Sequence, residues 1–134
     1  MGKLLTVKTG KKTIQDKVNL IARLRDCKGK DGGTNCISCG YYYTFDELEG
    51  GHFINRTSSA IRFDLRNINA QCHTCNFHRH GNARHYYHGM IKKYGEKITK
   101  ELEDQERITK TWKLYELQEL NDILDKRLEE DNVG

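Results

Sequence analysis

The fold of this chain is decided by the stretch NINAQCHTCN at residues 67–76, taken together with CISC at residues 36–39. Each stretch has two cysteines separated by two residues, a spacing that lets both thiolates of a tight turn face one metal ion. Two such turns complete a tetrahedral site, which predicts a structural zinc ion bound by Cys36, Cys39, Cys72 and Cys75. A site closed by four thiolates has no open position, so this zinc is expected to stabilise the fold and not to catalyse.

Two disulfides are the alternative use of these four cysteines. The N-terminus has no long apolar run and no secretory cleavage site, and a reducing compartment favours thiolate–metal bonds over disulfides. Cys27 is left over, and we expect a buried or half-buried thiol at a helix end with no chemistry.

Length and composition predict one domain with a small core, since 36% of the 134 residues are hydrophobic and 31% are charged. A zinc site would reinforce such a core. No stretch approaches the ~20 apolar residues of a membrane helix, so a membrane protein is excluded and a cytoplasmic location is expected. Proline is absent, which permits long helices.

The charge is unevenly distributed along the chain. Lys and Arg exceed Asp and Glu by 6 in residues 1–40 and by 3 in residues 41–95, whereas residues 96–134 have a net charge of −5. A basic front and middle suit a polyanionic partner, but a solvated charged surface explains the same balance. Charge alone leaves both interpretations open.

Hydrophobic spacing predicts a helix over residues 12–26, with Ile14, Val18, Ile21, Ala22 and Arg25 along one face. Residues 41–45 and 52–56 have strand composition and are expected to form a hairpin around a turn at 46–51. A helix is expected to begin at Asn76, to be broken or re-aimed near Gly81, and to end before Gly95. One long helix is predicted for the tail, from apolar residues at three- and four-residue steps: Ile108, Trp112, Leu114, Leu117, Leu120, Ile123, Leu124 and Leu128. The tail packs on the core, pairs with a second copy or binds a partner protein as a helix.

Six histidines fall between residues 52 and 88, around the second cysteine pair. His52 follows two glycines that allow a sharp turn or a close approach of a ligand, and a histidine there suits a general base. Asn76 directly follows Cys75. Its side chain suits a helix N-cap, and an oxygen at a helix start can also bind a hard cation.

In its order of CxxC, Gly-His and Cys-x-x-Cys-Asn, the chain resembles the zinc-containing HNH endonucleases of the ββα-metal, or His-Me finger, fold. The similarity is closer still to the NinG/Rap recombination proteins of lambdoid phages, and it covers roughly residues 20–100. The segments that show it are residues 22–26, 36–40, 51–53, 62–63, 67–72, 75–76 and 81–82, with Tyr86, Gly89, Ile91 and Gly95. The resemblance implies an α+β fold, a small ββα-metal core stapled by the four-cysteine zinc site, with a basic N-terminal helix and a long C-terminal helix. The expected organisation is a basic helical segment at 1–35, the nuclease core at 36–95, and an acidic amphipathic helix at 96–134.

The resemblance also implies roles for individual residues. His52 would be the general base, Asn67 would brace the loop by side-chain hydrogen bonds, and Asn76 would bind a catalytic Mg²⁺ or Mn²⁺. Many HNH enzymes have a metal-binding Asp directly before the general base, where this chain has Gly51. His80 is the first candidate for the missing ligand, because it would share a helix face with Asn76 if the helix continued. The other candidates are His78, Asn82, Asp46, Glu47 and Glu49.

The function implied is a metal-dependent DNA endonuclease, selective for branched DNA such as Holliday junctions and D-loops, in phage recombination within the bacterial host. A less selective HNH nicking enzyme and a non-catalytic zinc-finger nucleic-acid-binding protein remain alternatives. Candidate DNA contacts are Lys12, Lys17, Arg23, Arg56, Arg62, Arg66, Arg79 and Arg84. Symmetrical cutting of two strands needs two active sites, so a homodimer formed through the C-terminal helix is also expected.

Overall fold

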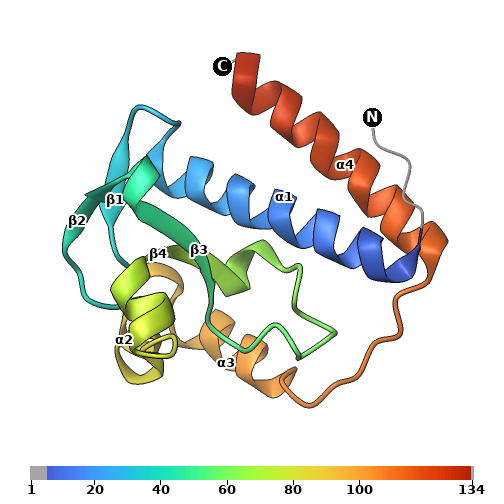
Figure 1. Cartoon of the computed structure of the whole chain (residues 1–134). Coiled ribbons are helices and arrows are strands. Elements are labelled where there is room, and N and C mark those ends of the chain that lie inside the picture. Colours follow the sequence, from blue (N-terminus) through green and yellow to red (C-terminus); the bar gives the residue numbers. More distant parts are fainter. Residues whose placement is uncertain (1–5, 134) are drawn as a thin grey trace.

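The computed structural model describes residues 6–133 and shows two long helices on one side and a smaller helical pair on the other (Figure 1). The order of elements is α1 (Val7–Cys27), β1 (Gly33–Asn35), β2 (Tyr42–Thr44), η1 (Phe45–Glu47), β3 (Leu48–His52), η2 (Leu65–Asn67), β4 (Ile68–Cys72), η3 (Thr74–His78), α2 (Ala83–Tyr94), α3 (Glu96–Asp104) and α4 (Leu114–Val133). This is the expected mixture of helices with small antiparallel sheets, an α+β protein. In the part of the chain that the structure describes, no helix is long and apolar enough to span a membrane.

Helix α1 is longer than its hydrophobic pattern predicts. Thr6 caps its start, because the Thr6 hydroxyl accepts a hydrogen bond from the Thr9 amide at 3.0 Å. Lys28 ends it in a left-handed conformation with φ of 56°. The predicted apolar face is confirmed, since Ile14, Val18, Ile21 and Ala22 are all fully buried.

The C-terminal region is two helices, so the prediction of one long helix is wrong. Helix α3 ends at Asp104, and α4 begins only at Leu114. The connection between them is tied to the loop before β4, because the Trp112 indole N–H donates to the Ser59 carbonyl and its ring packs on Phe63. Ile108 lies in this connection and is 53% exposed, so its helical spacing was coincidental. Residues 105–113 are therefore held in a non-helical conformation by the tertiary contacts of Trp112, although local spacing favours a helix there.

Helix α4 packs along α1, and both lie side by side in Figure 1. Leu117 and Leu124 join Ile14 and Val18 in one hydrophobic cluster. Helix α4 therefore packs on the core, which is the first of the alternatives for the tail. Pairing with a second copy stays a prediction.

The strands form two separate antiparallel pairs, so the predicted hairpin of 41–45 with 52–56 is wrong. β2 pairs back with β1, and β3 pairs with β4 in a register that places Leu48 opposite Cys72 and His52 opposite Ile68. The chain turns within η1, where the Glu47 carboxylate accepts hydrogen bonds from the Thr44 amide and hydroxyl. Most of the expected turn, including both glycines, is therefore strand.

Gly50 and Gly51 are required by close packing and not by a turn. A Cβ at Gly50 would lie 2.9 Å from the Cα of Asn19 on α1, and one at Gly51 would lie 2.0 Å from Oε1 of Gln71. β3 is therefore sandwiched tightly between α1 and its partner strand. The resulting unit of strand, loop, strand and helical turn runs from β3 through η3, and α2 and α3 pack beside it around Tyr86, Met90 and Leu102.

Candidate functional site

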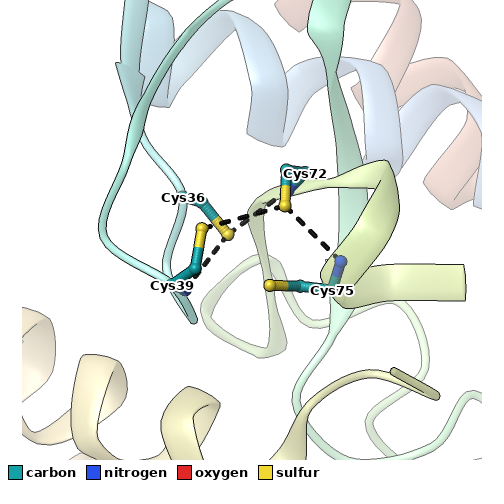
Figure 2. Close-up of side chains that lie close together, drawn as sticks. All are labelled: Cys36, Cys39, Cys72 and Cys75. Carbon is teal, nitrogen blue, oxygen red and sulfur yellow. Dashed lines mark hydrogen bonds between the residues drawn. The ribbon is translucent and has the colours of Figure 1, made fainter. Parts of the chain in front are cut away.

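The four paired cysteines converge on one point, as Figure 2 shows. Their sulfur atoms all lie within 4.8 Å of one another. Cys36 and Cys39 come from the turn between β1 and β2, while Cys72 ends β4 and Cys75 lies in η3. Four thiols at this separation fit the tetrahedral ligand set of zinc. The predicted metal centre is confirmed to the extent that these residues could bind a zinc ion.

Backbone and side-chain N–H groups surround the sulfurs. The Cys72 amide lies 3.3 Å from the Cys36 sulfur, the Cys75 amide 3.4 Å from the Cys72 sulfur, and the Asn82 side-chain amide 3.5 Å from the Cys75 sulfur. Burial disfavours a thiolate at Cys72, but the hydrogen bonds it accepts, first from the Cys75 amide, outweigh this and lower its pKa. These donors suit the negative charge of a metal-bound thiolate. Cys27 is buried at the end of α1, as predicted, and lies outside the four-sulfur group.

His52 is held at the end of β3 as a neutral imidazole. Its Nε2 lies 3.0 Å from the carbonyl oxygen of Arg62. A carbonyl can only accept, so Nε2 has the proton and Nδ1 keeps its lone pair. Burial lowers the pKa of His52, and the nearby positive charges of Arg62 and Arg56 lower it further. The ring is therefore unprotonated and oriented near pH 7, as a general base must be.

Asn67 closes the loop that follows His52. The Asn67 side chain is fully buried, accepts from the Ile54 amide at 2.8 Å, and donates to the Ile54 carbonyl at 3.0 Å. It satisfies both backbone groups of Ile54, two residues after His52. This geometry suits the loop-bracing role that the resemblance assigns to Asn67.

Asn76 lies in the middle of η3 and faces β3. Its side-chain Nδ2 donates to Oε1 of Glu49 at 2.7 Å, and the other Glu49 oxygen lies 2.7 Å from Nδ1 of His73. Burial raises the pKa of Glu49, but these two side-chain hydrogen bonds outweigh it and the net pKa is lowered. Of the three acidic residues considered as a replacement for the missing Asp, Glu49 is the one that contacts Asn76. Glu47 instead caps Thr44.

The helical argument for His80 fails. Helix η3 ends at His78, and His80 has a left-handed φ of 50° beyond it, so His80 shares no helix face with Asn76. Asn82 faces the Cys75 sulfur. Within residues 6–133, no hydrogen bond joins His52 to Asn76. His52 ends β3, whereas Asn76 lies in η3 and contacts β3 at Glu49.

A basic cleft of about 700 Å³ lies between the first half of α1 and the loop after β3. The cationic residues lining it are Lys8, Lys11, Lys12, Arg56 and Arg62. Arg62 joins the cleft to His52, because its carbonyl contacts the imidazole while its guanidinium Nε contacts Gln15 at 3.3 Å. Three predicted DNA contacts, at positions 12, 56 and 62, thus line one cleft, which Arg62 connects to His52.

The other predicted DNA contacts are dispersed. Lys17 is ion-paired with Asp125 of α4, and Arg66 with Asp64 and Glu101. Arg23 covers the Phe45 ring at 4.1 Å. Arg79 and Arg84 lie exposed after η3 and in α2. Internal pairing makes phosphate contacts by Lys17 and Arg66 costly.

A buried ionic network behind the site was not predicted. Asp26 accepts from the Arg25 guanidinium at 2.8 Å, from Lys93 at 2.7 Å and from the Ala70 amide at 2.9 Å. Asn69 accepts from both Lys93 and Tyr94 in the same network. It ties the end of α1 to β4 and α2. No local pattern indicates it, because Ala70 and Lys93 are 44 and 67 residues from Asp26 in sequence.

Fold and site together define a small α+β protein with four clustered cysteines that could bind a zinc ion, next to a strand–loop–strand–turn unit that presents a histidine and two asparagines. The profile of the family described as "Bacteriophage Lambda NinG protein" matches residues 3–131, and the chain belongs to this NinG family. The "Protein ninG" of Escherichia phage 933W is 39% identical over 95 residues, covering 69% of this chain and 43% of the relative. The protein of the same name from Salmonella phage P22 is 35% identical over 128 residues, covering 88% of this chain and 59% of the relative.

The relative from Escherichia phage lambda is 38% identical over 95 residues, covering 69% of this chain and 43% of its own length. The chain thus spans about half the length of the curated relatives it matches. No solved structure matches it.

Proposed function

We propose that this protein is a metal-dependent endonuclease that hydrolyses phosphodiester bonds in DNA. The observation that supports this best is a neutral, oriented His52 bonded to the carbonyl of Arg62, a residue that lines a basic cleft, with Asn67 bracing the loop that follows His52. Hydrolysis of a phosphodiester needs an activated water and a cation that stabilises the developing negative charge.

In this proposal His52 activates the water. Its Nδ1 accepts the proton of the attacking water while Nε2–H stays bonded to the Arg62 carbonyl. The lowered pKa keeps the imidazole able to accept that proton at neutral pH. The Arg62 carbonyl also stabilises the imidazolium that forms.

The catalytic cation would bind at Asn76 and Glu49, which lie together on two elements through the hydrogen bond from Asn76 Nδ2 to Glu49. The Asn76 amide oxygen and the Glu49 carboxylate would be the ligands. Oxygen ligands suit Mg²⁺ and Mn²⁺, and such a site leaves positions open for water and for phosphate. When bound, the cation would stabilise the charge on the phosphate and the leaving oxygen. Glu49 would thereby replace the metal-binding Asp for which this chain has Gly51. His80 is the weaker candidate for this ligand.

Lys8, Lys11, Lys12, Arg56 and Arg62 would hold the DNA backbone, a contact that positions the duplex without selecting a sequence. Selectivity for branched DNA, and a role in phage recombination within the bacterial cytoplasm, extend this proposal on the strength of the family resemblance. A dimer would supply the second active site for symmetrical cutting.

The test compares cleavage of a four-way junction with cleavage of a linear duplex of the same sequence, using zinc-loaded protein and added Mg²⁺ or Mn²⁺. We expect the junction to be cut by the wild type and not by His52→Ala, whose zinc content and circular dichroism stay unchanged. Equal cutting of both substrates would remove the selectivity for branched DNA and leave a nicking enzyme.

A zinc-containing DNA-binding module without catalysis is the second candidate, because Gly51 stands where many relatives of the HNH class have a metal ligand. Tight DNA binding without cleavage under either ion would establish it. Lys11→Gln is expected to weaken binding and its salt dependence under both proposals. Cleavage by the wild type that is lost in His52→Ala therefore decides between them.

A further inference from the structure

An exposed aromatic ring stands next to the proposed cation site. Phe77 follows Asn76 directly in η3 and is 65% exposed. The ring is fixed in place nonetheless. It stacks on the His73 imidazole with centroids 5.3 Å apart and planes at 7°, and His78 packs edge-on at 5.2 Å.

The His73 ring is itself anchored to the strand. Its Nδ1 lies 2.7 Å from Oε2 of Glu49, whose other oxygen contacts Asn76. One carboxylate therefore orients both the Asn76 amide and the imidazole under Phe77. One face of Phe77 is occupied by this stack, and the residue as a whole is still 65% exposed, so ring surface is available to a ligand.

The sequence segment that contains Phe77 suits a polyanion. Residues 65–95 contain no Asp or Glu, and they include five Lys or Arg and five His. Arg66 and Lys93 are ion-paired with acidic residues outside the segment, whereas Arg79 and Arg84 are exposed. The acidic residue nearest the ring in the contacts described is Glu49, whose carboxylate is engaged by His73 and Asn76. A pre-ordered aromatic face in a segment rich in cationic side chains is the combination that binds a nucleobase together with its phosphate.

From these contacts we propose that Phe77 is a stacking platform for an unpaired DNA base, so that the protein prefers DNA with a single-stranded branch or end. The proposal rests on the proposed function for DNA as the ligand. A base inside a duplex is covered on both faces by its neighbours, whereas an unpaired base has a face free for Phe77. The nucleotide on Phe77 would be close to the phosphate at Asn76, so the platform would select where cutting occurs.

The test measures binding by fluorescence anisotropy without Mg²⁺ or Mn²⁺, so no strand is cut. The probes are a duplex with a short single-stranded flap and a blunt duplex of equal length. We expect Phe77→Ala to raise the Kd for the flapped DNA about 10-fold and to leave the Kd for the blunt duplex unchanged. Phe77→Trp is expected to keep the preference, because it retains an aromatic face.

Tyr115→Ala is the matched control, since Tyr115 is 62% exposed on the acidic helix α4. We expect no change with either probe. Equal weakening of both probes by Phe77→Ala, or an unchanged Kd for the flapped DNA, would overturn the proposal. Photocrosslinking adds a positive readout, because 5-iododeoxyuridine in the flap should crosslink to the peptide containing Phe77, and crosslinking elsewhere alone would contradict it.

These outcomes are separable from those of the nuclease test. A preference for flapped DNA that depends on Phe77, in a protein that cuts nothing, would support the platform and reject the endonuclease. Cleavage that is lost in His52→Ala but unchanged in Phe77→Ala, with unchanged binding of the flapped DNA, would support the endonuclease and reject the platform.

Discussion

The side-chain nitrogen of Asn76 lies 2.7 Å from a carboxylate oxygen of Glu49, and this contact joins the cysteine-bearing turn η3 to the strand that ends at His52. This hydrogen bond adds to the pairing of β3 with β4 in linking the four cysteines to His52. Anything that displaces η3 moves Asn76 relative to β3.

Replacing Glu49 should impair catalysis without unfolding the protein. We expect Glu49→Gln to reduce cleavage about 10- to 100-fold, the usual loss when a group that binds or orients a metal ligand is altered. The reason is the loss of a negative charge beside Asn76. Glu47→Gln is the control, because Glu47 caps Thr44 and does not contact Asn76. Titration of Mn²⁺ against initial rate checks this, and equal losses in both variants would contradict it.

The acidic limb of the pH–rate profile should report the pKa of His52. A general base works when unprotonated, and burial, Arg62 and Arg56 lower the pKa of His52. Activity is therefore expected to persist below pH ~6.5, the ordinary value for histidine. Removing a cation raises that pKa, so Arg56→Gln should move the acidic limb to higher pH. The measurement is kcat/KM between about pH 5 and 8, and a limb that does not move in Arg56→Gln would argue against His52 as the base.

Loss of the metal centre should unfold the region around it. Structural zinc contributes on the order of 10 kcal/mol to the folding of small domains, and Cys72 joins β4 to the centre. We expect Cys72→Ser to lose bound zinc and the single tryptophan's native fluorescence, Trp112 being packed on Phe63. Cys27→Ser should keep the zinc, since Cys27 lies outside the cluster. Metal analysis and fluorescence check both variants, and equal zinc in the two would refute the assignment.

The ionised Asp26 carboxylate should stabilise the folded protein at pH values above the ordinary pKa of an aspartate. Burial raises the pKa of Asp26, but hydrogen bonds from Arg25 and Lys93 outweigh this and lower it below 3.8. A lowered folded-state pKa contributes stability that is present above the unfolded pKa and is lost as pH falls through the folded one. Asp26→Asn should cost about 3 kcal/mol at pH ~7, the loss typical of a broken buried ionic network.

The exposed residue Asp16 supplies the control, because its ion pair with Lys12 is at the surface. Asp16→Asn should change the free energy of unfolding by less than about 0.5 kcal/mol. Urea unfolding at about pH 7 and about pH 2.5, below the ordinary pKa of the carboxyl, measures both. The difference between wild type and Asp26→Asn should narrow at the lower pH, and a constant difference would show that charge is not the cause.

The sequence predicted those parts of the molecule that depend on local periodicity or on ligand spacing. The apolar face of α1 and the four cysteines were both found, because helical repeats and CxxC spacing are properties of short segments. The break near Gly81 and the end of α2 before Gly95 followed from glycine positions with φ of 89° and 87°.

The errors arose where distant partners decide the structure. The sequence favours a turn at Gly50 and Gly51, but in the structure their lack of a side chain allows Asn19 and Gln71 to approach β3 closely. The π-helical η3 ends two residues too early for His80 to share a face with Asn76. Asp26, Asn69 and Lys93 were missed altogether, because their significance exists only once α1, β4 and α2 have come together.

The contact of α1 with α4 has a consequence for how the chain is made. Lys17 of α1 and Asp125 of α4 are 108 residues apart in sequence. Helix α4 is therefore synthesised only after all the elements between the two helices, and α1 cannot contact it before then. The four cysteines are all available once Cys75 has left the ribosome. A nascent chain that captures zinc at that stage would already have β4 and η3 fixed and α1 packed against them, which leaves the docking of α4 on α1 as the last step of folding.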